Sequence, residues 1–177
     1  MQKIRISYKN KYFADVESLY VEAFPADERR DIEAFRQIAA CNPAFAADVF
    51  VGDNEEFLGF FTTWTWDDLR YGEHFAVRQD RRGGGIGSKA LQAVIADDPR
   101  PLILEVELPD NDMARRRIGF YERNGLRLWE AIPYVQPPYD AERNALPMLL
   151  MTAGDIQLSP DDPRVERLLR DVYGFEK

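Results

Sequence analysis

A glycine-rich and basic segment lies near the middle of the chain, between Val77 and Lys89. It reads Val-Arg-Gln-Asp-Arg-Arg-Gly-Gly-Gly-Ile-Gly-Ser-Lys, with four basic side chains against one acidic side chain between residues 78 and 89. Glycine has no Cβ, so successive backbone N–H groups in such a loop can turn toward one point and bind an anion. A helix that begins at the end of the loop would add its unpaired first-turn N–H groups and the positive end of its dipole. The segment therefore indicates a phosphate or pyrophosphate site, and the alternative is a flexible turn with solvated arginine side chains.

Three phosphate-binding patterns can be compared with this segment. The Walker pattern requires Gly-Lys followed by Ser or Thr, and the Gly-Ser-Lys of residues 87–89 has the wrong order. The dinucleotide fingerprint fits by its letters, because residues 85–90 read Gly-x-Gly-x-x-Ala and Glu105 follows the first glycine by 20 residues. That fingerprint should follow a strand directly, whereas seven residues separate it from the preceding apolar run. The third pattern is Arg/Gln-x-x-Gly-x-Gly/Ala, in which the first position is Arg or Gln and the last is Gly or Ala. Residues 82–87 satisfy it.

Hydrophobic periodicity predicts the elements that must position this loop. Alternating apolar residues and short apolar runs predict strands at residues 4–8, 46–52, 56–66, 70–77, 102–108, 126–132 and 146–152. Helical spacing predicts helices at residues 15–24, 31–40, 88–95, 113–124 and 163–173. Three consecutive strands precede the first helix that can cross between strands. This order predicts a mixed sheet, with antiparallel pairing early in the chain and parallel pairing later.

Several residues mark the ends of these elements. Asp31 can cap the second helix, and Asp162 ahead of Pro163 can start the last one. Gly125 stands directly after the fourth helix, where a helix commonly ends. Three prolines between residues 133 and 144 predict a loop.

The composition excludes several classes of protein. With 177 residues and 45% apolar content, we expect one domain over residues 1–177, with a main body at 1–153 and a C-terminal tail with a helix at 154–177. A net charge of −8 argues against a nucleic-acid binder, which needs a basic face. One cysteine, Cys41, and one histidine, His74, exclude a cysteine-rich zinc site and a His–His motif, so we expect no metal. The chain has neither an apolar run of about 18 residues nor a signal-peptide stretch, so we expect a cytoplasmic monomer or homodimer with no membrane segment.

Two stretches of the sequence, with a predicted strand between them, resemble the GNAT superfamily of N-acetyltransferases. The first is the Arg-Gly-Gly-Gly-Ile-Gly of residues 82–87, which begins five residues after Val77. The second is the Ile-Gly-Phe-Tyr-Glu-Arg-Asn-Gly-Leu of residues 118–126, with Leu126 in place of the usual Phe. The resemblance covers residues 1–153. Further stretches are similar to a bacterial branch of the superfamily, namely residues 22–25, 28–29, 73–77, 104–107 and 136–139.

The resemblance implies an α/β fold, with a mixed, mostly antiparallel sheet, two parallel central strands that splay apart, and helices on both faces. Acetyl-CoA, the acetyl donor, would lie between the strands that end at Val77 and Glu107. Backbone groups of Phe75, Ala76 and Val77 would hold the pantetheine arm and the acetyl carbonyl, and N–H groups of the loop would hold the pyrophosphate. The loop residues concerned are Arg82, Gly83, Gly84, Gly85, Ile86, Gly87 and Ser88.

The chain departs from the family pattern at one position. Many members carry an asparagine seven residues before the tyrosine of the second stretch, where it contacts the pantetheine arm. Here that position is Ala114. Either a neighbour such as Asn111 takes over the contact or the contact is missing.

The resemblance implies direct attack by an amine on the thioester carbonyl, which poses two proton problems. An alkyl amine with a pKa of about 10 is mostly protonated at neutral pH and cannot attack before it loses a proton. The thiolate also leaves more readily when it is protonated. Tyr121 is the expected acid, because family members carry a tyrosine near the CoA sulfur; the alternative is a buried ring that only packs on the sheet.

The base is expected on the strand at residues 70–77. Strand alternation would place Tyr71, Glu73, Phe75 and Val77 on one face, and Gly72, His74 and Ala76 on the other. Family bases on this strand share the parity of Glu73, which is therefore the first choice, directly or through water. A β-bulge would exchange the faces and hand the role to His74.

The expected acceptor is a small molecule with a primary amine. Phe24, Glu28, Tyr71 and Glu105 are the candidate acceptor-binding residues. Two other functions remain open. One is a non-catalytic module that binds acyl-CoA on the same fold, and the other is an NAD-dependent oxidoreductase that uses the glycine fingerprint of residues 85–90.

Overall fold

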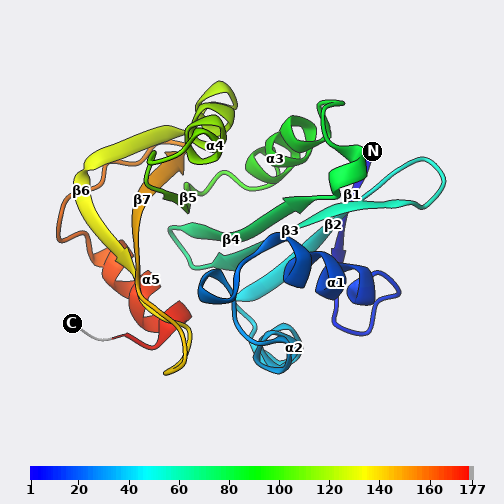
Figure 1. The fold of residues 1–177 in the computed structure, drawn as a ribbon, viewed down its shortest axis with the longest axis horizontal. Helices are drawn as coiled ribbons and strands as arrows, with labels where there is room; N and C mark the ends of the chain where they lie inside the picture. Colours follow the sequence, from blue (N-terminus) through cyan, green and yellow to red (C-terminus); the bar gives the residue numbers. More distant parts are fainter. Residues whose placement is uncertain (176–177) are drawn as a thin grey trace.

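A mixed sheet of seven strands forms the middle layer of residues 1–175, which are the residues that the computed structural model describes (Figure 1). The strand order is β1-β2-β3-β4-β5-β7-β6, and β4–β5 is the parallel pair. The strands are β1 (Gln2–Ile6), β2 (Phe45–Val51), β3 (Phe57–Thr65), β4 (Arg70–Val77), β5 (Leu102–Glu107), β6 (Arg127–Gln136) and β7 (Leu146–Ala153). The predicted α/β class and mixed, mostly antiparallel sheet are confirmed.

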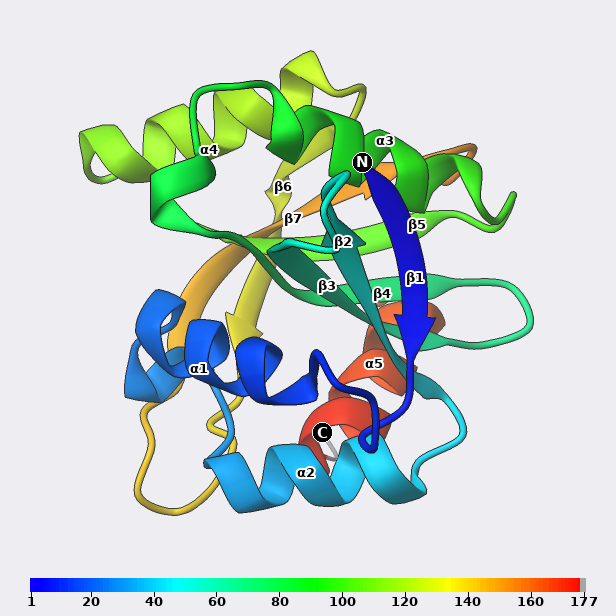
Figure 2. The same cartoon turned by 90° about the vertical axis from the view of Figure 1, so that its right-hand side faces the viewer.

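Helices cover both faces of the sheet, as Figure 2 shows, with α3 and α4 above it and α1, α2 and α5 below it. They are α1 (Phe13–Ala23), α2 (Ile32–Cys41), α3 (Ile86–Ala96), α4 (Asp112–Arg123) and α5 (Pro163–Tyr173). Two short 3₁₀ turns occupy Ala26–Glu28 and Gln79–Arg81. Within residues 1–175, no helix is both long and apolar enough to cross a bilayer.

The predicted end signals explain where three helices start or stop. The Asp31 carboxylate accepts hydrogen bonds from the backbone N–H groups of residues 33 and 34, and the Asp162 carboxylate caps α5 ahead of Pro163 in the same way. Gly125 follows α4 with φ +88°, a left-handed conformation that glycine adopts without steric cost. Local sequence therefore sets these boundaries.

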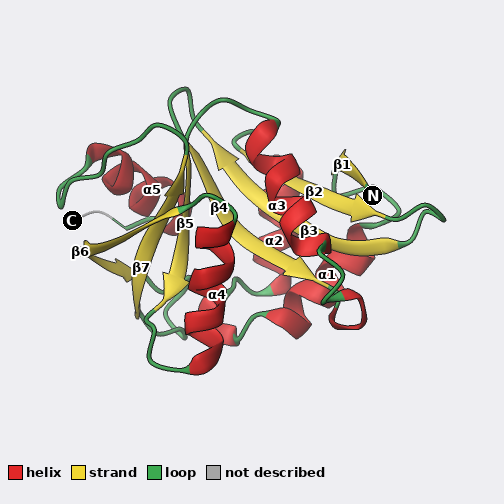
Figure 3. Cartoon of the chain, turned by 90° about the horizontal axis from the view of Figure 1, so that it is seen from above, coloured by secondary structure: helices red, strands yellow, loops and turns green. Residues whose placement is uncertain are grey.

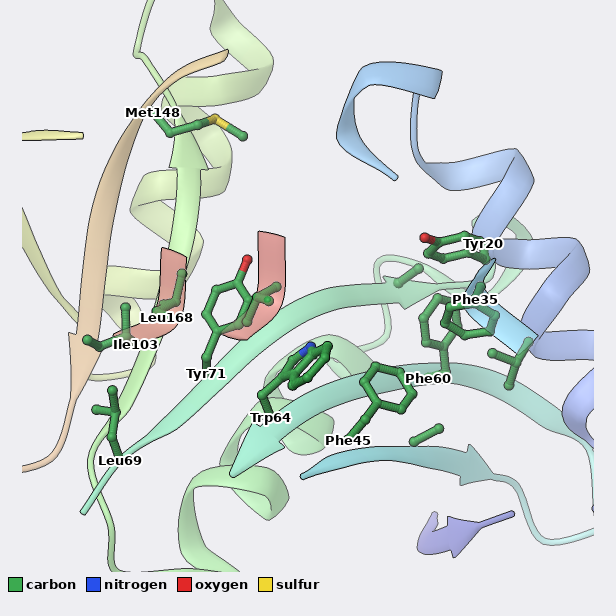
Figure 4. Packing of buried hydrophobic residues seen from close by; sticks show 14 of the residues in the cluster. Tyr20, Phe35, Phe45, Phe60, Trp64, Leu69, Tyr71, Ile103, Met148 and Leu168 are labelled. Carbon is green, nitrogen blue, oxygen red and sulfur yellow. The ribbon is translucent and has the colours of Figure 1, made fainter. Parts of the chain in front are cut away.

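Two apolar clusters lie on opposite faces of the sheet. The first joins α1, α2 and α5 to the sheet, and Figure 4 shows part of it, including Tyr20, Phe35, Phe45, Phe60, Trp64, Tyr71 and Leu168. The second lies under α3 and α4, which cross the near face of the sheet in Figure 3. The tail after Ala153 belongs to the first cluster, because the side chains of Val165, Leu168, Leu169 and Val172 are buried there. The tail helix thus completes one face of the sheet.

The two central strands pair over a short length and then separate. Residues 70–72 of β4 pair with residues 102–104 of β5, and no further β4–β5 pair follows within the described chain. Strand β5 continues alongside β7 to Glu107, while β4 continues alongside β3 to Val77. The splayed parallel pair is therefore confirmed, and the carboxyl ends of both strands face the gap between them.

A β-bulge lies in β4 where the strands separate. Thr62 of β3 is opposite His74 and Thr63 is opposite Gly72, which leaves Glu73 as the extra residue. As a result, Glu73 and His74 both turn toward the α1 face, where the His74 ring lies 4.7 Å from the ring of Tyr20. The predicted alternation along β4 is wrong beyond Gly72, because the additional residue breaks the period of two.

The bulge also changes the face of the last strand residues. Phe75 packs on the α3–α4 face, with its ring 5.2 Å from Phe61 and 6.4 Å from Phe120. Tyr71 instead belongs to the cluster on the α1 face. The two aromatic residues, predicted to share a face, therefore lie on opposite faces.

Strand β6 extends into the segment that was predicted to be a loop. Residues 134–136 pair with residues 146–148 of β7, after a register shift between Trp129 and Tyr134. The shift leaves Pro133 outside the paired positions, where its missing N–H costs no ladder hydrogen bond. The three prolines predicted a loop over this whole segment. The register shift that lets the strand continue past Pro133 could not be predicted from the sequence.

Candidate active site

A cavity of about 710 Å³ occupies the gap between the splayed strands. Its walls come from β4 and β5, from the loop before α3, from α4, and from the segments after α1 and β6. The lining residues named in the sequence predictions are Phe24, Glu28, Glu73, His74, Phe75, Ala76, Val77, Arg82, Gly83, Gly85, Gly87, Ser88, Glu105 and Tyr121. The fold therefore brings most of the predicted site residues to one place.

The glycine-rich loop lies at one end of the cavity and presents unpaired backbone N–H groups. Gly85 is the N-cap of α3 with φ +75°, and no side chain caps the helix. Among residues 1–175, no backbone carbonyl accepts from the N–H groups of residues 83–88, whereas the N–H of Lys89 already bonds to the Gly85 carbonyl. These N–H groups and the helix dipole make an anion site.

The glycines of the loop differ in what surrounds them. A Cβ added at Gly83, Gly84 or Gly85 would meet no atom within 4 Å. A Cβ at Gly87 would lie 3.4 Å from the Phe120 ring and 3.9 Å from the Val77 side chain. The absence of a Cβ at Gly87 therefore leaves space between Val77 of β4 and Phe120 of α4. At Gly83, Gly84 and Gly85 it leaves the backbone accessible to a ligand.

Side chains fix the loop to the strand before it and to the helix that packs beside it. Arg82 donates from Nε to the Val77 carbonyl at 3.0 Å. Asn124, at the end of α4, donates to the Ser88 hydroxyl at 3.2 Å. The residues present therefore fit a pyrophosphate-bearing ligand, with N–H donors at the loop and an apolar passage beside it.

Tyr121 lies on α4 and lines the cavity. Its ring packs against the apolar cluster under α3 and α4, and 8% of the residue is exposed. Burial raises the pKa of Tyr121 to about 12, although Arg117 acts to lower it. The phenol is therefore protonated at neutral pH, as a proton donor must be.

Glu73, the first choice for the base, is held in a buried ion pair. Its carboxylate accepts from Arg30, from Trp64 Nε1 at 2.9 Å and from the Tyr139 hydroxyl at 3.1 Å. Burial acts to raise the pKa of Glu73, but the charge of Arg30 prevails and the pKa lies below its ordinary value. A carboxylate with these three donors is a weak proton acceptor.

His74, the alternative base, is buried beside Glu73. Its Nε2 lies 3.0 Å from the backbone carbonyl of Glu28, to which the neutral ring donates, and Nδ1 lies 3.8 Å from a Glu73 oxygen. Nδ1 is buried and has no hydrogen-bond partner among residues 1–175. Burial lowers the pKa of His74 to about 4, so the ring is neutral near pH 7. These contacts suit a structural histidine better than a base.

Glu105 lies on the other splayed strand and is surrounded by tyrosines. The hydroxyl of Tyr173 donates to Oε2 at 2.9 Å, and the hydroxyl of Tyr134 donates to Oε1. Burial raises the pKa of Glu105 to about 7, although hydrogen bonds from Tyr134, Tyr173 and Tyr71 act to lower it. The sequence predictions did not include Tyr173 or Tyr139 in the site, because their positions depend on how the tail and the β6–β7 loop pack.

The remaining predicted residues divide between the wall of the cavity and its surroundings. Phe24 and Glu28 line it, whereas Tyr71 is 1% exposed and does not line it; the Tyr71 hydroxyl lies 2.8 Å from that of Tyr173. Gly84 and Ile86 belong to the loop but do not line the cavity. No group of three or more His, Cys, Asp or Glu side chains within residues 1–175 is arranged to hold a metal ion.

Asn111, one of the two alternatives for the pantetheine contact that Ala114 lacks, forms a different hydrogen bond. The Asn111 side chain accepts from the Ala114 backbone N–H at 2.9 Å and caps α4. Ala114 itself is buried in the cluster under α3 and α4. Asn111 therefore caps the start of α4, and Ala114 packs this helix against the sheet.

Comparisons with known proteins agree with this architecture. The family model described as acetyltransferase (GNAT) family matches residues 13–126. No curated protein matches the chain. The solved structure of a protein assigned to the GNAT family of acetyltransferases, from Bacteroides thetaiotaomicron, is 35% identical, covers 99% of this chain and 100% of its own, and has a TM-score of 0.92.

More distant structures share the fold. An aminoglycoside 6'-N-acetyltransferase complexed with coenzyme A is 18% identical, with 90% of this chain and 99% of its own covered and a TM-score of 0.59. A GNAT family acetyltransferase from Elizabethkingia anophelis with acetyl-CoA bound is 16% identical, with 87% and 97% covered and a TM-score of 0.60.

Proposed function

Because the chain belongs to the acetyltransferase (GNAT) family, we propose that it transfers an acetyl group from acetyl-CoA to the primary amine of a small molecule. The observation that carries this proposal is the row of unpaired backbone N–H groups at residues 83–88, which opens onto the gap between β4 and β5. Such a row binds a pyrophosphate, and the gap beside it suits the extended pantetheine arm. Two distant structures of the same fold hold coenzyme A or acetyl-CoA, which supports this choice of acetyl donor.

The cavity supplies what the reaction needs at neutral pH. Loop N–H groups would hold the pyrophosphate, while backbone groups of Phe75, Ala76 and Val77 would contact the pantetheine arm and the acetyl carbonyl. Tyr121 would give its proton to the departing thiolate, because its hydroxyl is protonated and no other side chain within residues 1–175 accepts its hydrogen bond. The contacts of Glu73 and His74 argue against either residue as the base.

A thermal-shift titration tests the choice of ligand. Acetyl-CoA or CoA at about 100 times its dissociation constant should stabilise the protein by about 2.7 kcal/mol, and NAD and ATP should not raise the melting temperature. Equal shifts from NAD and CoA would contradict the proposal and favour the oxidoreductase alternative. The reaction itself is tested by release of free thiol from acetyl-CoA over a panel of primary amines.

One observation favours a second function, a non-catalytic module that binds acyl-CoA. Ala114 stands where many family members use an asparagine to contact the pantetheine arm, and the nearby Asn111 side chain is engaged in capping α4. The two functions differ in one measurement. A module of this kind would bind acetyl-CoA in the thermal-shift titration and release no thiol with any amine.

A further inference from the structure

Four carboxylates line the cavity, and within residues 1–175 two of them, Glu28 and Glu105, have no ion-pair partner. We call the part of the cavity around Glu105 its acceptor end. Glu73 pairs with Arg30 and Glu107 pairs with Arg117, so each of these carboxylates has a guanidinium partner. Glu105 lines the same cavity, and its hydrogen-bond donors are uncharged tyrosine hydroxyls. We propose that Glu105 binds the ammonium group of the acceptor and takes up the proton that this group must lose before it attacks. This inference rests on the proposed acetyl transfer.

Three tyrosines from three elements fix the Glu105 carboxylate; we call Tyr71, Tyr134 and Tyr173 the tyrosine collar. Tyr134 of β6 and Tyr173 of α5 donate to it directly, and the hydroxyl of Tyr71 of β4 lies 2.8 Å from that of Tyr173. The Tyr134 hydroxyl donates to Oε1, and the single proton of the Tyr173 hydroxyl lies between the two carboxylate oxygens, with its oxygen 3.1 Å from Oε1 and 2.9 Å from Oε2. A carboxylate oxygen has room for two donors, so Oε2 can accept one more from a ligand.

The surroundings of Glu105 favour a cationic ligand. The groups that face it are the tyrosine collar, Tyr139 and the carboxylate of Glu73, whose charge Arg30 offsets. His74 is neutral near pH 7, because burial lowers its pKa to about 4. An ionised Glu105 therefore leaves one negative charge in this part of the cavity without a protein partner. A bound ammonium group would offset that charge and favour the ionised carboxylate.

The proton affinity of Glu105 also suits the task. Burial raises the pKa of Glu105 to about 7, against the opposing effect of its tyrosine hydrogen bonds, so the group can hold or release a proton near neutral pH. A general base works best when its pKa lies near the operating pH. An ordinary carboxyl group, with a pKa of about 4, would be a weaker proton acceptor.

The protons and bonds of the step balance. One ammonium N–H bond breaks and its proton passes to the Glu105 carboxylate. The freed lone pair forms the C–N bond to the acetyl carbonyl carbon, the C–S bond breaks with its electron pair on sulfur, and sulfur takes the Tyr121 proton. After the C–N bond forms, the nitrogen loses a second proton to solvent, and solvent returns a proton to the Tyr121 phenolate. Glu105 releases its proton to solvent, so amide, free thiol and one proton are the products.

The experiment compares pH–rate profiles of the wild-type protein with Glu105→Gln and with Glu107→Gln, a matched control on the same strand. We expect wild-type kcat/KM to fall on the acidic side of an apparent pKa near 7. Glu105→Gln should lose this acidic limb, lower kcat/KM at neutral pH by about 10²- to 10⁴-fold, and recover in part at high pH, where more amine is neutral. Glu107→Gln should keep the limb. Tyr173→Phe should shift the limb to higher pH, because it removes a donor that favours the ionised carboxylate.

Each alternative result has a distinct meaning. If Glu105→Gln keeps the wild-type profile while the wild-type protein transfers acetyl groups, the assignment of Glu105 is wrong and the proposed function stands. If the wild-type protein binds CoA but acetylates no amine, the proposed function fails and the assignment fails with it. A difference infrared titration of wild-type protein against Glu105→Gln adds a readout without turnover. A carboxyl signal that titrates near pH 7 supports the assignment, and a signal that titrates near the ordinary value for Glu contradicts it.

Discussion

Two glutamates in the same cavity have pKa values that move in opposite directions, and their neighbours explain the difference. Both carboxylates are buried, which by itself raises the pKa of each. Arg30 reverses the direction for Glu73, whereas Glu105 has tyrosine hydroxyls as donors and keeps a raised value of about 7. Neighbouring carboxyl groups with separated pKa values commonly have separate roles, and here one is structural and the other is proposed to move a proton.

At the residue scale, Tyr121→Phe should lower kcat and leave the affinity for acetyl-CoA nearly unchanged. The ring still packs against the cluster under α3 and α4, and the substitution removes only the proton donor. Acid catalysis is typically worth about 10²- to 10⁴-fold. Steady-state kinetics together with a CoA titration would check this, and wild-type turnover in the variant would limit Tyr121 to packing.

Glu73→Gln should act on stability, because it leaves the buried Arg30 guanidinium without its partner. Removing one member of a buried ion pair costs about 3–5 kcal/mol, measurable by denaturant unfolding. The pKa of Glu73 lies below its ordinary value, so this stabilisation is present above the ordinary pKa of Glu and is lost as the pH falls through the lowered value. The wild-type and variant unfolding curves should therefore converge in acid.

The double variant Glu73→Gln with Arg30→Gln is the matched control for this pair. It removes both charges, so it should be more stable than the sum of the two single changes implies. An unchanged unfolding midpoint in Glu73→Gln, combined with a fall in kcat, would instead assign Glu73 the role of base.

At the scale of elements, the site depends on a bulge in the middle of β4 and on the glycine loop that follows this strand. The bulge at Glu73 directly follows Gly72, the last residue of β4 that pairs with β5. Glu73 and His74 therefore turn toward α1 at the point where β4 separates from β5. The loop after Val77 then starts α3 with unpaired N–H groups facing the gap. One strand thus provides both a wall of the acceptor end and the anion site.

Gly87→Glu should abolish the rise in melting temperature with CoA and leave the unliganded fold intact. Its side chain would start between Val77 and the Phe120 ring, fill the passage beside the loop, and repel a phosphate. Gly84→Ala is the matched control, because it keeps the backbone N–H, does not require a left-handed φ and adds a Cβ that meets no atom within 4 Å. Retained CoA affinity in Gly87→Glu would show that the ligand lies elsewhere.

At the scale of the whole molecule, the C-terminal tail supports the sheet and contributes to the cavity. Helix α5 closes the face of the sheet that α1 and α2 leave uncovered on the β5–β7 side (Figure 1). Arg30 donates to the Val172 carbonyl at 2.6 Å, and Tyr173 reaches Glu105. We therefore propose that residues 1–177 act as one unit, with the tail linked to the acceptor end.

A chain that ends at Ala153 should fail to fold cooperatively. The truncation removes five buried apolar side chains, each worth about 1.5–3 kcal/mol, and their sum approaches the total stability of a typical domain, about 5–15 kcal/mol. They are Ile156, Val165, Leu168, Leu169 and Val172. Thermal unfolding followed by circular dichroism would check this, with Tyr173→Phe as a full-length control that should unfold cooperatively. A cooperative, wild-type-like transition in the truncated chain would make the tail dispensable.

The sequence by itself determined the local features of this protein. Helix ends at Asp31, Gly125 and Asp162 follow from capping chemistry, and the anion site follows from glycines placed before a helix. Apolar residues that recur every two residues located the strands, and those that recur every three to four residues located the helices. This pattern is local, because it involves residues only a few positions apart. The order of elements then predicted a mixed sheet, and the resemblance to the GNAT superfamily implied the splayed parallel pair.

Only the tertiary structure decided which carboxylate is free to do chemistry. Glu73 is paired with an arginine 43 residues away, and Glu105 meets a tyrosine 68 residues away. The face that Glu73 occupies depends on a bulge whose register is set by β3. The ionisation of a buried group depends on every charge and donor that packs against it, and such partners are distant in sequence. That is why strand parity and the family resemblance favoured Glu73 as the base, whereas the packed structure favours Glu105.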